Sequence, residues 1–146
     1  MNLSQILSVE RIAVDVVAAS KKRVLEEIAS RLSKPGLALS EVLTSLTGRE
    51  KLGSTGLGHG VAIPHGRLPS VDASLGAFIR LRNPVDYAAH DGQPVDLVFG
   101  LLVPQNATGD HLKHLAAIAE KLSDEVFCEK TRAATDAAAL YALLTH

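Results

Sequence analysis

One histidine, His65, is notable because its neighbours restrict its backbone. It lies between Pro64 and Gly66 at the end of the segment STGLGHGVAIPHG, residues 54–66. A neutral imidazole can serve as a base, a metal ligand or a nucleophile near pH 7. Proline fixes its own φ before the ring, and we expect the glycine to let the backbone turn away after it. These residues predict a ring presented to a cleft at a strand's edge, either functional or an ordinary loop histidine.

The segment KLGSTGLGHG, residues 51–60, is rich in glycine and is predicted to be a loop. Exposed N–H groups and missing side chains suit close approach by a phosphate or by another protein's backbone. The loop lacks the patterns of P-loop and dinucleotide-binding sites, and the chain has no G-x-S-x-G motif of a hydrolase. A flexible loop without a ligand is the competing interpretation.

Two residues outside this loop favour a phosphate group. Arg49 ends a predicted helix just before the loop, and a guanidinium can pair with two phosphoryl oxygens at once. His111 follows Thr108 and Asp110 at the start of another predicted helix, where N–H groups and the helix dipole favour negative charge. Arg49 alone would be an ordinary surface charge, so its significance depends on the combination.

A metal site is the main competing chemistry. His111 and His114 lie three residues apart on a predicted helix, and His59 and His65 are the histidines that could complete a set. However, H-x-x-H lacks the glutamate of a zinc-protease helix, and no cysteine or carboxylate pair supplies the other half. We therefore expect no metal, and we expect His114 to lie at the edge of the core.

These residues require a scaffold of helices and strands. Apolar residues recur at helical spacing in two segments near the N-terminus, capped by Ser20 and Ser40, and in two later segments, the last capped by Thr135 or Asp136. The predicted helices are residues 20–34, 40–50, 108–124 and 135–146, and the predicted strands are residues 11–17, 61–64, 73–82 and 94–104. The last strand is apolar enough to be covered on both faces.

The expected fold class is α/β. We predict a single domain over residues 1–146, a sandwich with a mixed sheet of about 4–5 strands flanked by helices on both faces. Composition limits the function classes, since 15 basic and 16 acidic residues and 3% aromatics do not suggest a nucleic-acid partner. No apolar run reaches the roughly 18 residues of a membrane span. The N-terminus lacks an export signal and Cys128 is the only cysteine, so we expect a cytoplasmic protein.

The segment from Glu50 to Gly66 also resembles a phosphorylation-site signature. After Glu50 and six further residues come Leu57 and Gly58, and after two more comes the run VAIPHG. This pattern is similar to that of the fructose/mannitol-type (type 2) enzyme IIA family of the phosphoenolpyruvate-dependent phosphotransferase system. The resemblance continues in SKKR, QPVDLVFGLLVP and HLKHLAAIAEKLSD, and it is closest to the nitrogen-regulatory enzyme IIA branch.

The resemblance implies a role for each main candidate residue. His65 would accept a phosphoryl group on Nε2 from a phosphohistidine of an HPr-type carrier protein. Arg49 would neutralise charge on the transferring group, and His111 would donate a hydrogen bond to its oxygens. The donor is a phosphorylated protein rather than ATP, so no cofactor and no metal are implied.

The resemblance also implies a surface that admits the carrier. Its apolar rim would include Leu57, Ile63 and Leu68. The candidate residues for binding phosphate or the partner are Ser54, Thr55, Gly56, Gly58 and Gly66.

Two functions share this chemistry. A nitrogen-regulatory IIA protein would bind its targets according to the phosphorylation state of His65, with a potassium transporter or a sensor kinase as candidate targets. A sugar-specific IIA protein would relay the phosphoryl group to a IIB domain for sugar uptake. The resemblance favours a mainly regulatory phosphotransferase component, and the sequence leaves the target and the oligomeric state open.

Overall fold

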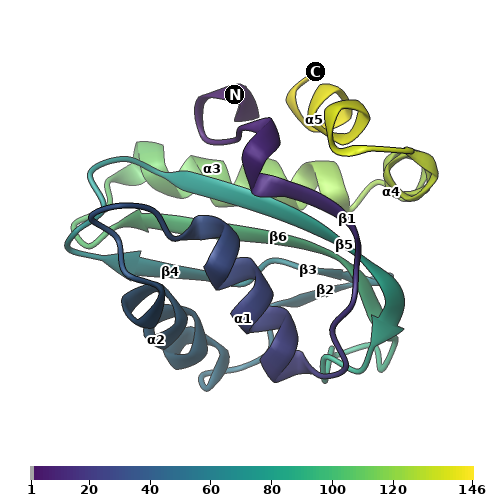
Figure 1. Ribbon diagram of the computed structural model, residues 1–146, viewed down its shortest axis with the longest axis horizontal. Helices are drawn as coiled ribbons and strands as arrows, with labels where there is room; N and C mark the ends of the chain where they lie inside the picture. The colour runs from purple at the N-terminus through teal and green to yellow at the C-terminus, as the bar shows by residue number, and fades with distance from the viewer. Residues whose placement is uncertain (1) are drawn as a thin grey trace.

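The computed structural model describes residues 2–146, which fold around a six-stranded sheet. The strand order is β1-β5-β6-β3-β2, and β4 pairs with β6 along the same edge as β3 (Figure 1). The strands are β1 Ile12–Val16, β2 Gly56–Gly58, β3 Val61–Ala62, β4 His65–Leu68, β5 Leu75–Val85 and β6 Val95–Pro104. The α-helices are α1 Lys21–Leu32, α2 Leu39–Glu50, α3 Gly109–Leu122, α4 Glu125–Ala133 and α5 Ala137–Thr145.

The sheet is mixed, as predicted. Its central strands β5 and β6 are antiparallel, with Phe78 opposite Phe99. Strand β1 is parallel to β5, both β3 and β4 are parallel to β6, and β2 returns antiparallel to β3. The sheet has six strands rather than about 4–5, because the short strands β2 and β4 lie in segments that carry no apolar alternation.

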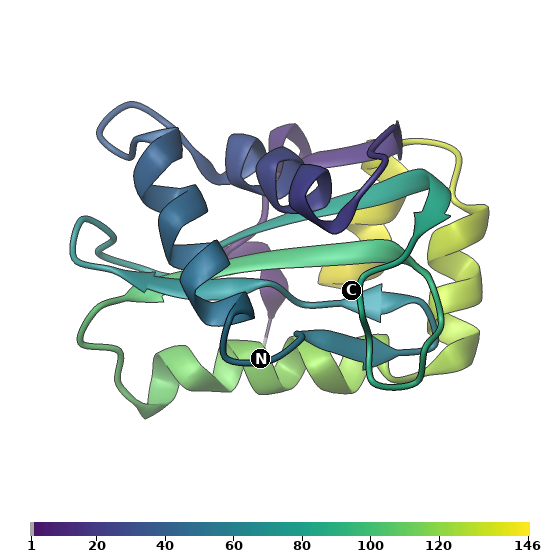
Figure 2. The same ribbon diagram turned by 90° about the horizontal axis from the view of Figure 1, so that it is seen from below.

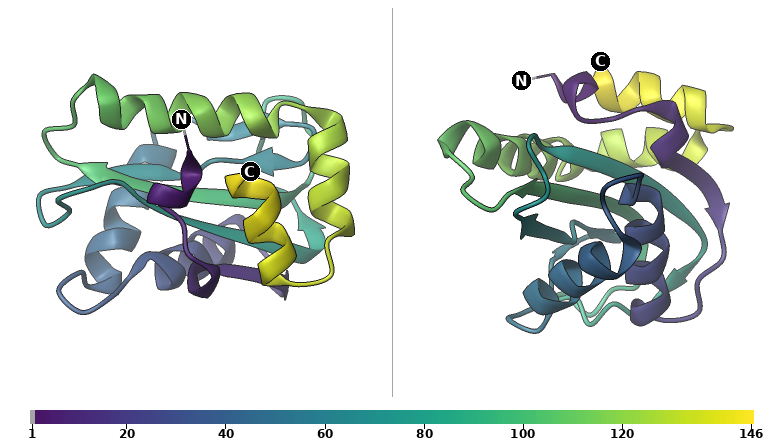
Figure 3. Two further views of the ribbon diagram at one scale, coloured as in Figure 1. Left: turned by 90° about the horizontal axis from the view of Figure 1, so that it is seen from above. Right: turned by 60° about the vertical axis from the view of Figure 1, so that its left-hand side comes forward.

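Helices cover both faces of this sheet, which confirms the predicted sandwich. The pair α1 and α2 lies on one face, as Figure 2 shows. The helices α3, α4 and α5 lie on the other face together with the N-terminal 3-10 turns η1 (Leu3–Gln5) and η2 (Val9–Arg11) (Figure 3). No helix within residues 2–146 combines the length and apolar character needed to cross a bilayer.

The apolar residues of strand β6 contribute to two hydrophobic cores, one on each face of the sheet. Leu97 and Phe99 are fully buried against the helices α3 to α5, whereas Val98 and Leu102 are fully buried against α1 and α2. Alternate side chains of a strand point to opposite faces, so a strand covered on both sides must be apolar throughout. Each such side chain contributes roughly 1.5–3 kcal/mol of burial free energy, which stabilises β6 as the strand with which β4 and its His65 pair.

The helix starts near the N-terminus agree only in part with the prediction. Ser20 caps α1, since its Oγ accepts a hydrogen bond from the Arg23 N–H at 3.2 Å. The prediction for Ser40 was wrong: α2 begins one residue earlier at Leu39, after Ala38, and no side chain caps it. The backbone of Ala38 accepts the first bonds of the helix instead, from the N–H groups of Glu41 and Val42.

Strand β4 begins at His65 and changes the expected part played by Gly66. Gly66 continues the strand in parallel pairing with β6 and lies opposite Leu102, so the chain does not turn away there. A Cβ atom at Gly66 would collide with Ser45 of α2, whose own Cβ would lie only 3.1 Å away. Glycine is therefore required for helix α2 to approach the strand that carries the histidine.

The C-terminal helices follow the predicted pattern with one addition. Asp136 caps α5 by accepting the Ala139 N–H at 2.8 Å, one of the two predicted caps. Helix α4 was not predicted as a separate element. Asp124 caps it through the N–H groups of Val126 and Phe127 and so interrupts the helical pattern after α3.

Candidate functional site

His65 is the first residue of β4 and is partly buried. Its Nδ1 lies 2.8 Å from the backbone carbonyl oxygen of Ile63. A carbonyl oxygen can only accept a hydrogen bond, so Nδ1 carries the proton in this contact. In the neutral ring Nε2 then keeps an unshared electron pair, and Nε2 is the nitrogen able to act as a nucleophile.

The surroundings keep the His65 ring neutral. Burial lowers the pKa of His65 below its ordinary value of 6.5, and the positive charge of Arg49 lowers it further. The hydrogen bond to Ile63 and the negative charge of Glu50 oppose this shift without reversing it. The lone pair on Nε2 is therefore available at neutral pH.

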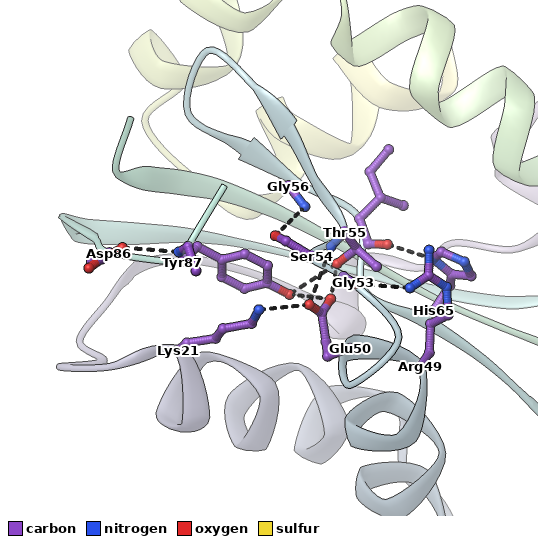
Figure 4. A network of polar contacts seen from close by, with 12 residues as sticks. Lys21, Arg49, Glu50, Gly53, Ser54, Thr55, Gly56, His65, Asp86 and Tyr87 are labelled. Atoms are coloured by element: carbon purple, nitrogen blue, oxygen red, sulfur yellow. Dashed lines mark hydrogen bonds and ion pairs between the residues drawn. The ribbon is translucent and has the colours of Figure 1, made fainter. Parts of the chain in front are cut away.

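Arg49 lies beside this ring, as Figure 4 shows. It belongs to the last turn of α2, and its Nη1 donates a hydrogen bond to the backbone carbonyl of Gly53 at 2.9 Å. This bond anchors one nitrogen of the guanidinium to the loop after α2 and leaves further N–H groups for an anion. The predicted pair of His65 and Arg49 is thus brought together on one cavity wall.

The cavity has a volume of about 420 Å³. Its polar lining residues are His65, Arg49, Ser45 and Arg67, and its apolar side chains come from the loop after α2, from β6 and from α3. The remaining lining residues are Gly48, Leu52, Gly66, Leu101, Val103, Leu112 and Leu115. Two positive guanidinium groups next to a neutral imidazole suit an anionic ligand.

The apolar rim differs from the predicted one. Ile63 and Leu68 are core residues, with only 5% and 8% of their surface exposed, and Leu57 is exposed but does not line the cavity. Leu52, 84% exposed in the loop after α2, and Leu112, 44% exposed on α3, form the outer part instead. Leu112 lies at helical spacing with the apolar residues of the predicted helix 108–124, but α3 turns that position outward.

His111 lies in the first turn of α3, where its ring caps the helix. Its Nδ1 accepts a hydrogen bond from the Thr108 N–H at 3.3 Å, so the proton of the neutral ring resides on Nε2. Nε2 is then able to donate a hydrogen bond, and donation to a phosphoryl oxygen is the role that the resemblance implies for His111. His111 itself is not among the residues lining the cavity, whereas Leu112 and Leu115 from the same helix are.

The other predicted phosphate or partner ligands make contacts elsewhere. Ser54 Oγ accepts the Gly56 N–H at 3.1 Å, and the Thr55 hydroxyl donates to the carboxylate of Glu50. A Cβ on Gly56 would lie 2.7 Å from the Cβ of Ala89, and Gly58 has a left-handed backbone with φ of 102°. Gly56 therefore allows close packing against Ala89, and Gly58 allows a turn. Of the predicted glycines, only Gly66 lines the cavity.

Sequence reasoning missed the polar cluster behind the site. Glu50 is buried, and its carboxylate is held by Lys21, Thr55 and Tyr87 (Figure 4). Burial alone would raise the pKa of Glu50, but the hydrogen bonds from Thr55, Lys21 and Tyr87 lower it below its ordinary value. The acidic position in the motif was a visible clue, but its partners come from distant segments.

The remaining histidines are engaged separately. His59 lies 3.3 Å from a carboxylate oxygen of Glu125, and His114 Nδ1 lies 3.0 Å from Ser74 Oγ. Within residues 2–146 no group of three or more His, Cys, Asp or Glu side chains is arranged to hold a metal ion.

A larger cavity of about 640 Å³ lies away from His65, between the β2–β3 turn and α4. Its main charged groups are paired with each other, since Arg132 donates to both carboxylate oxygens of Asp96 and His59 contacts Glu125. It contains neither His65 nor Arg49. The smaller cavity is therefore the candidate functional site.

The comparison with protein families agrees with this geometry. Residues 5–146 match the family described as "Phosphoenolpyruvate-dependent sugar phosphotransferase system, EIIA 2". The chain therefore belongs to the type 2 enzyme IIA family of this phosphotransferase system.

Similar proteins give a finer picture. The chain is 45% identical over 145 residues to a "Nitrogen regulatory protein" of Bradyrhizobium diazoefficiens, covering 99% of this chain and 95% of that one. The crystal structure of the nitrogen regulatory protein IIA-Ntr from Neisseria meningitidis matches with a TM-score of 0.93 and 46% identity, covering 98% and 99% of the two chains. A complex of enzyme IIAMTL and phosphorylated enzyme IIBMTL from Escherichia coli matches with a TM-score of 0.78 and 25% identity, covering 94% and 96%.

Proposed function

We propose that this chain is a nitrogen-regulatory enzyme IIA that accepts a phosphoryl group on Nε2 of His65 from a phosphorylated HPr-type carrier protein. The observation that carries the proposal is the contact between His65 Nδ1 and the Ile63 carbonyl, which leaves the lone pair on Nε2. The same ring lines a cavity with Arg49 and Arg67, whose positive charges suit a phosphoryl group.

The transfer exchanges one P–N bond for another. The lone pair of His65 Nε2 attacks phosphorus, the bond from phosphorus to the donor imidazole breaks, and the donor nitrogen takes its electron pair. His65 keeps its Nδ1 proton, so its ring becomes cationic while the protonated phosphohistidine of the donor becomes a neutral imidazole. The Ile63 carbonyl stabilises this new positive charge through the hydrogen bond that is already in place.

Arg49 is proposed to neutralise the phosphoryl oxygens as they pass between the two rings. Its anchored guanidinium needs little reorganisation during the transfer, which is the property that makes such groups effective. His111 would add a donor from Nε2 on the α3 side of the site. The apolar side chains of Leu52 and Leu112 would contact the carrier and exclude water.

The regulatory assignment rests on the relatives rather than on the site. Nitrogen regulatory proteins share 42–45% of their residues with this chain over nearly its full length. We propose that the phosphorylation state of His65 alters binding to target proteins in the cytoplasm, with a potassium transporter or a sensor kinase as candidates. The alternative is a sugar-specific relay to a IIB domain, which the fold shared with a mannitol IIA in complex with phosphorylated IIB favours.

Phosphorylation is tested with phosphoenolpyruvate, enzyme I and the HPr-type carrier. The wild-type protein should take up one acid-labile phosphoryl group and His65→Ala should take up none. Labelled phosphate on His65→Ala would overturn the proposal.

The regulatory function and the sugar relay are distinguished by whether a IIB domain accepts the phosphoryl group. The phosphorylated protein is mixed with a fructose- or mannitol-type IIB domain, and in parallel the wild type, His65→Ala and His65→Glu are used as bait in a pull-down. A regulatory protein should bind targets differently through His65→Glu, which mimics the phosphorylated state, than through His65→Ala, which cannot be phosphorylated. Fast transfer to IIB with no state-dependent target would instead support the sugar relay.

A further inference from the structure

The carboxylate of Glu50 lies at the C-terminal end of α2 with its hydrogen-bonding capacity filled. Oε1 accepts from the hydroxyl groups of Thr55 and Tyr87, and Oε2 accepts from the Thr55 N–H at 3.2 Å and from Lys21 Nζ at 2.9 Å. Its side chain is only 5% exposed. A buried charge with four donors from three different segments fixes the relative position of those segments.

The segment that Glu50 holds leads directly to His65. Thr55 gives Glu50 both its hydroxyl and its N–H, and the Thr55 carbonyl accepts the Ile63 N–H at 3.0 Å. The Ile63 carbonyl in turn accepts the proton of His65 Nδ1 at 2.8 Å. A continuous chain of hydrogen bonds therefore connects Glu50 with His65 through the two backbone segments that flank the β2–β3 hairpin. Figure 4 shows Glu50, Thr55 and His65 from this chain.

Glu50 cannot act on the phosphoryl group directly. It does not line the cavity that contains His65, Arg49 and Arg67. Its carboxylate also faces Tyr87, a fully buried residue from the segment after β5, and Lys21, the first residue of α1. Apart from the effect of its charge on the pKa of His65, the contacts of Glu50 reach the reacting ring through the backbone of Thr55 and Ile63.

We propose that Glu50 is a positioning residue that acts through Thr55 and Ile63 to hold His65 as the Nδ1–H tautomer. The tautomer of a histidine is set by the hydrogen bond that the other ring nitrogen makes, so a displaced Ile63 carbonyl releases this constraint. A proton on Nε2 would remove the lone pair that must attack phosphorus. This inference rests on the proposed function for its catalytic consequence, but the tautomer itself exists without any phosphoryl donor.

The test compares Glu50→Gln and Tyr87→Phe with the matched control Glu129→Gln, an exposed charge on α4. Glu50→Gln presents an NH2 group to donors that need an acceptor, whereas Tyr87→Phe removes one donor and keeps the buried ring. The protonated nitrogen of His65 is read from long-range 1H–15N spectra of the unphosphorylated protein at pH 7.5. Initial rates of phosphorylation are then measured at several concentrations of the phosphorylated carrier.

In the wild type and Glu129→Gln, we expect the proton entirely on Nδ1. In Glu50→Gln we expect a mixture of tautomers and a maximal rate that falls in proportion to the remaining Nδ1–H fraction, about 10-fold where one ring in ten keeps it. The half-saturating carrier concentration should be unchanged because the rim is untouched. Tyr87→Phe should change the tautomer of His65 and the maximal rate in the same direction, but to a smaller extent. If Glu50→Gln does not fold, Tyr87→Phe alone tests the inference.

If the 15N chemical shifts of His65 in both folded variants equal those of the wild-type protein, the inference is overturned, whether or not phosphorylation is slowed. Failure of the wild-type protein to be phosphorylated on His65 would overturn the proposed function instead. In that case a changed tautomer in Glu50→Gln would still support the positioning role.

Discussion

The backbone carbonyl oxygen of Ile63 lies 2.8 Å from Nδ1 of His65, two residues further along the chain. This contact determines which nitrogen can react and stabilises the cationic ring that phosphorylation creates. Pro64 between the two residues has a fixed φ, which restricts the backbone that places the His65 ring against this carbonyl. The short sequence Ile63-Pro64-His65 therefore keeps the proton on Nδ1 and leaves Nε2 able to react.

The first prediction concerns the pH dependence of this ring. Burial, together with the charge of Arg49, lowers the pKa of His65 below 6.5. Protonation of His65 Nε2 removes the lone pair that acts as the nucleophile. The phosphorylation rate should therefore stay level from pH 8 down to 6.5 and fall only at lower pH. An NMR titration of the His65 Cε1 proton should give a midpoint below 6.5, and Arg49→Ala should move that midpoint upward. A wild-type midpoint above 6.5 would contradict the assignment of burial as the dominant cause.

The second prediction concerns the guanidinium of Arg49. Arg49→Ala should slow phosphoryl transfer by about 100-fold while the fold is retained, because one preorganised charge at the phosphoryl group is lost. Arg49→Lys should fall in between, since it keeps the charge but loses the planar fork that bonds Gly53 and an anion together. Rates come from quenched-flow phosphorylation, and circular dichroism checks the fold. Arg31→Ala, on α1, is the control, and an Arg49→Ala rate equal to it would remove Arg49 from the site.

The third prediction concerns the rim of the cavity. Leu52 is 84% exposed and lines the cavity beside His65. Leu52→Asp should raise the half-saturating carrier concentration by about 10-fold and leave the maximal rate nearly unchanged, since only docking is affected. Val126→Asp changes an equally apolar side chain, 60% exposed on α4, and serves as the control. If both variants behave alike, the carrier does not dock on Leu52.

The sequence was sufficient for the parts of the fold that depend on local pattern. The apolar run of β6 and the helical stripes of α1 and α3 predicted a mixed sheet with helices on both faces. A central strand that is buried on both faces must consist almost entirely of apolar residues. The motif identified His65, and the basic end of the preceding predicted helix identified Arg49; both line the same cavity.

The parts that the sequence did not predict depend on distant partners. Strand β4 has only the four residues His65–Leu68 and is defined by its pairing with β6 rather than by its own alternation. The cluster around Glu50 joins Lys21 and Tyr87, which lie 29 residues before it and 37 residues after it in the chain. Periodicity within one segment carries no information about such contacts.

The fourth prediction separates two glycines of the same cavity by stability. Gly66→Ala should lower the free energy of unfolding by about 1–3 kcal/mol, because the added Cβ collides with Ser45 and pushes α2 away from β4. Gly48→Ala is the matched control in α2, where a Cβ meets no atom within 4 Å, and it should raise the free energy of unfolding by about 1 kcal/mol through helix propensity. Urea unfolding measures both, and the double variant Ser45→Gly with Gly66→Ala should lose less than the sum of the two single changes. Additive effects would mean that Gly66 is needed for a reason other than the approach of Ser45.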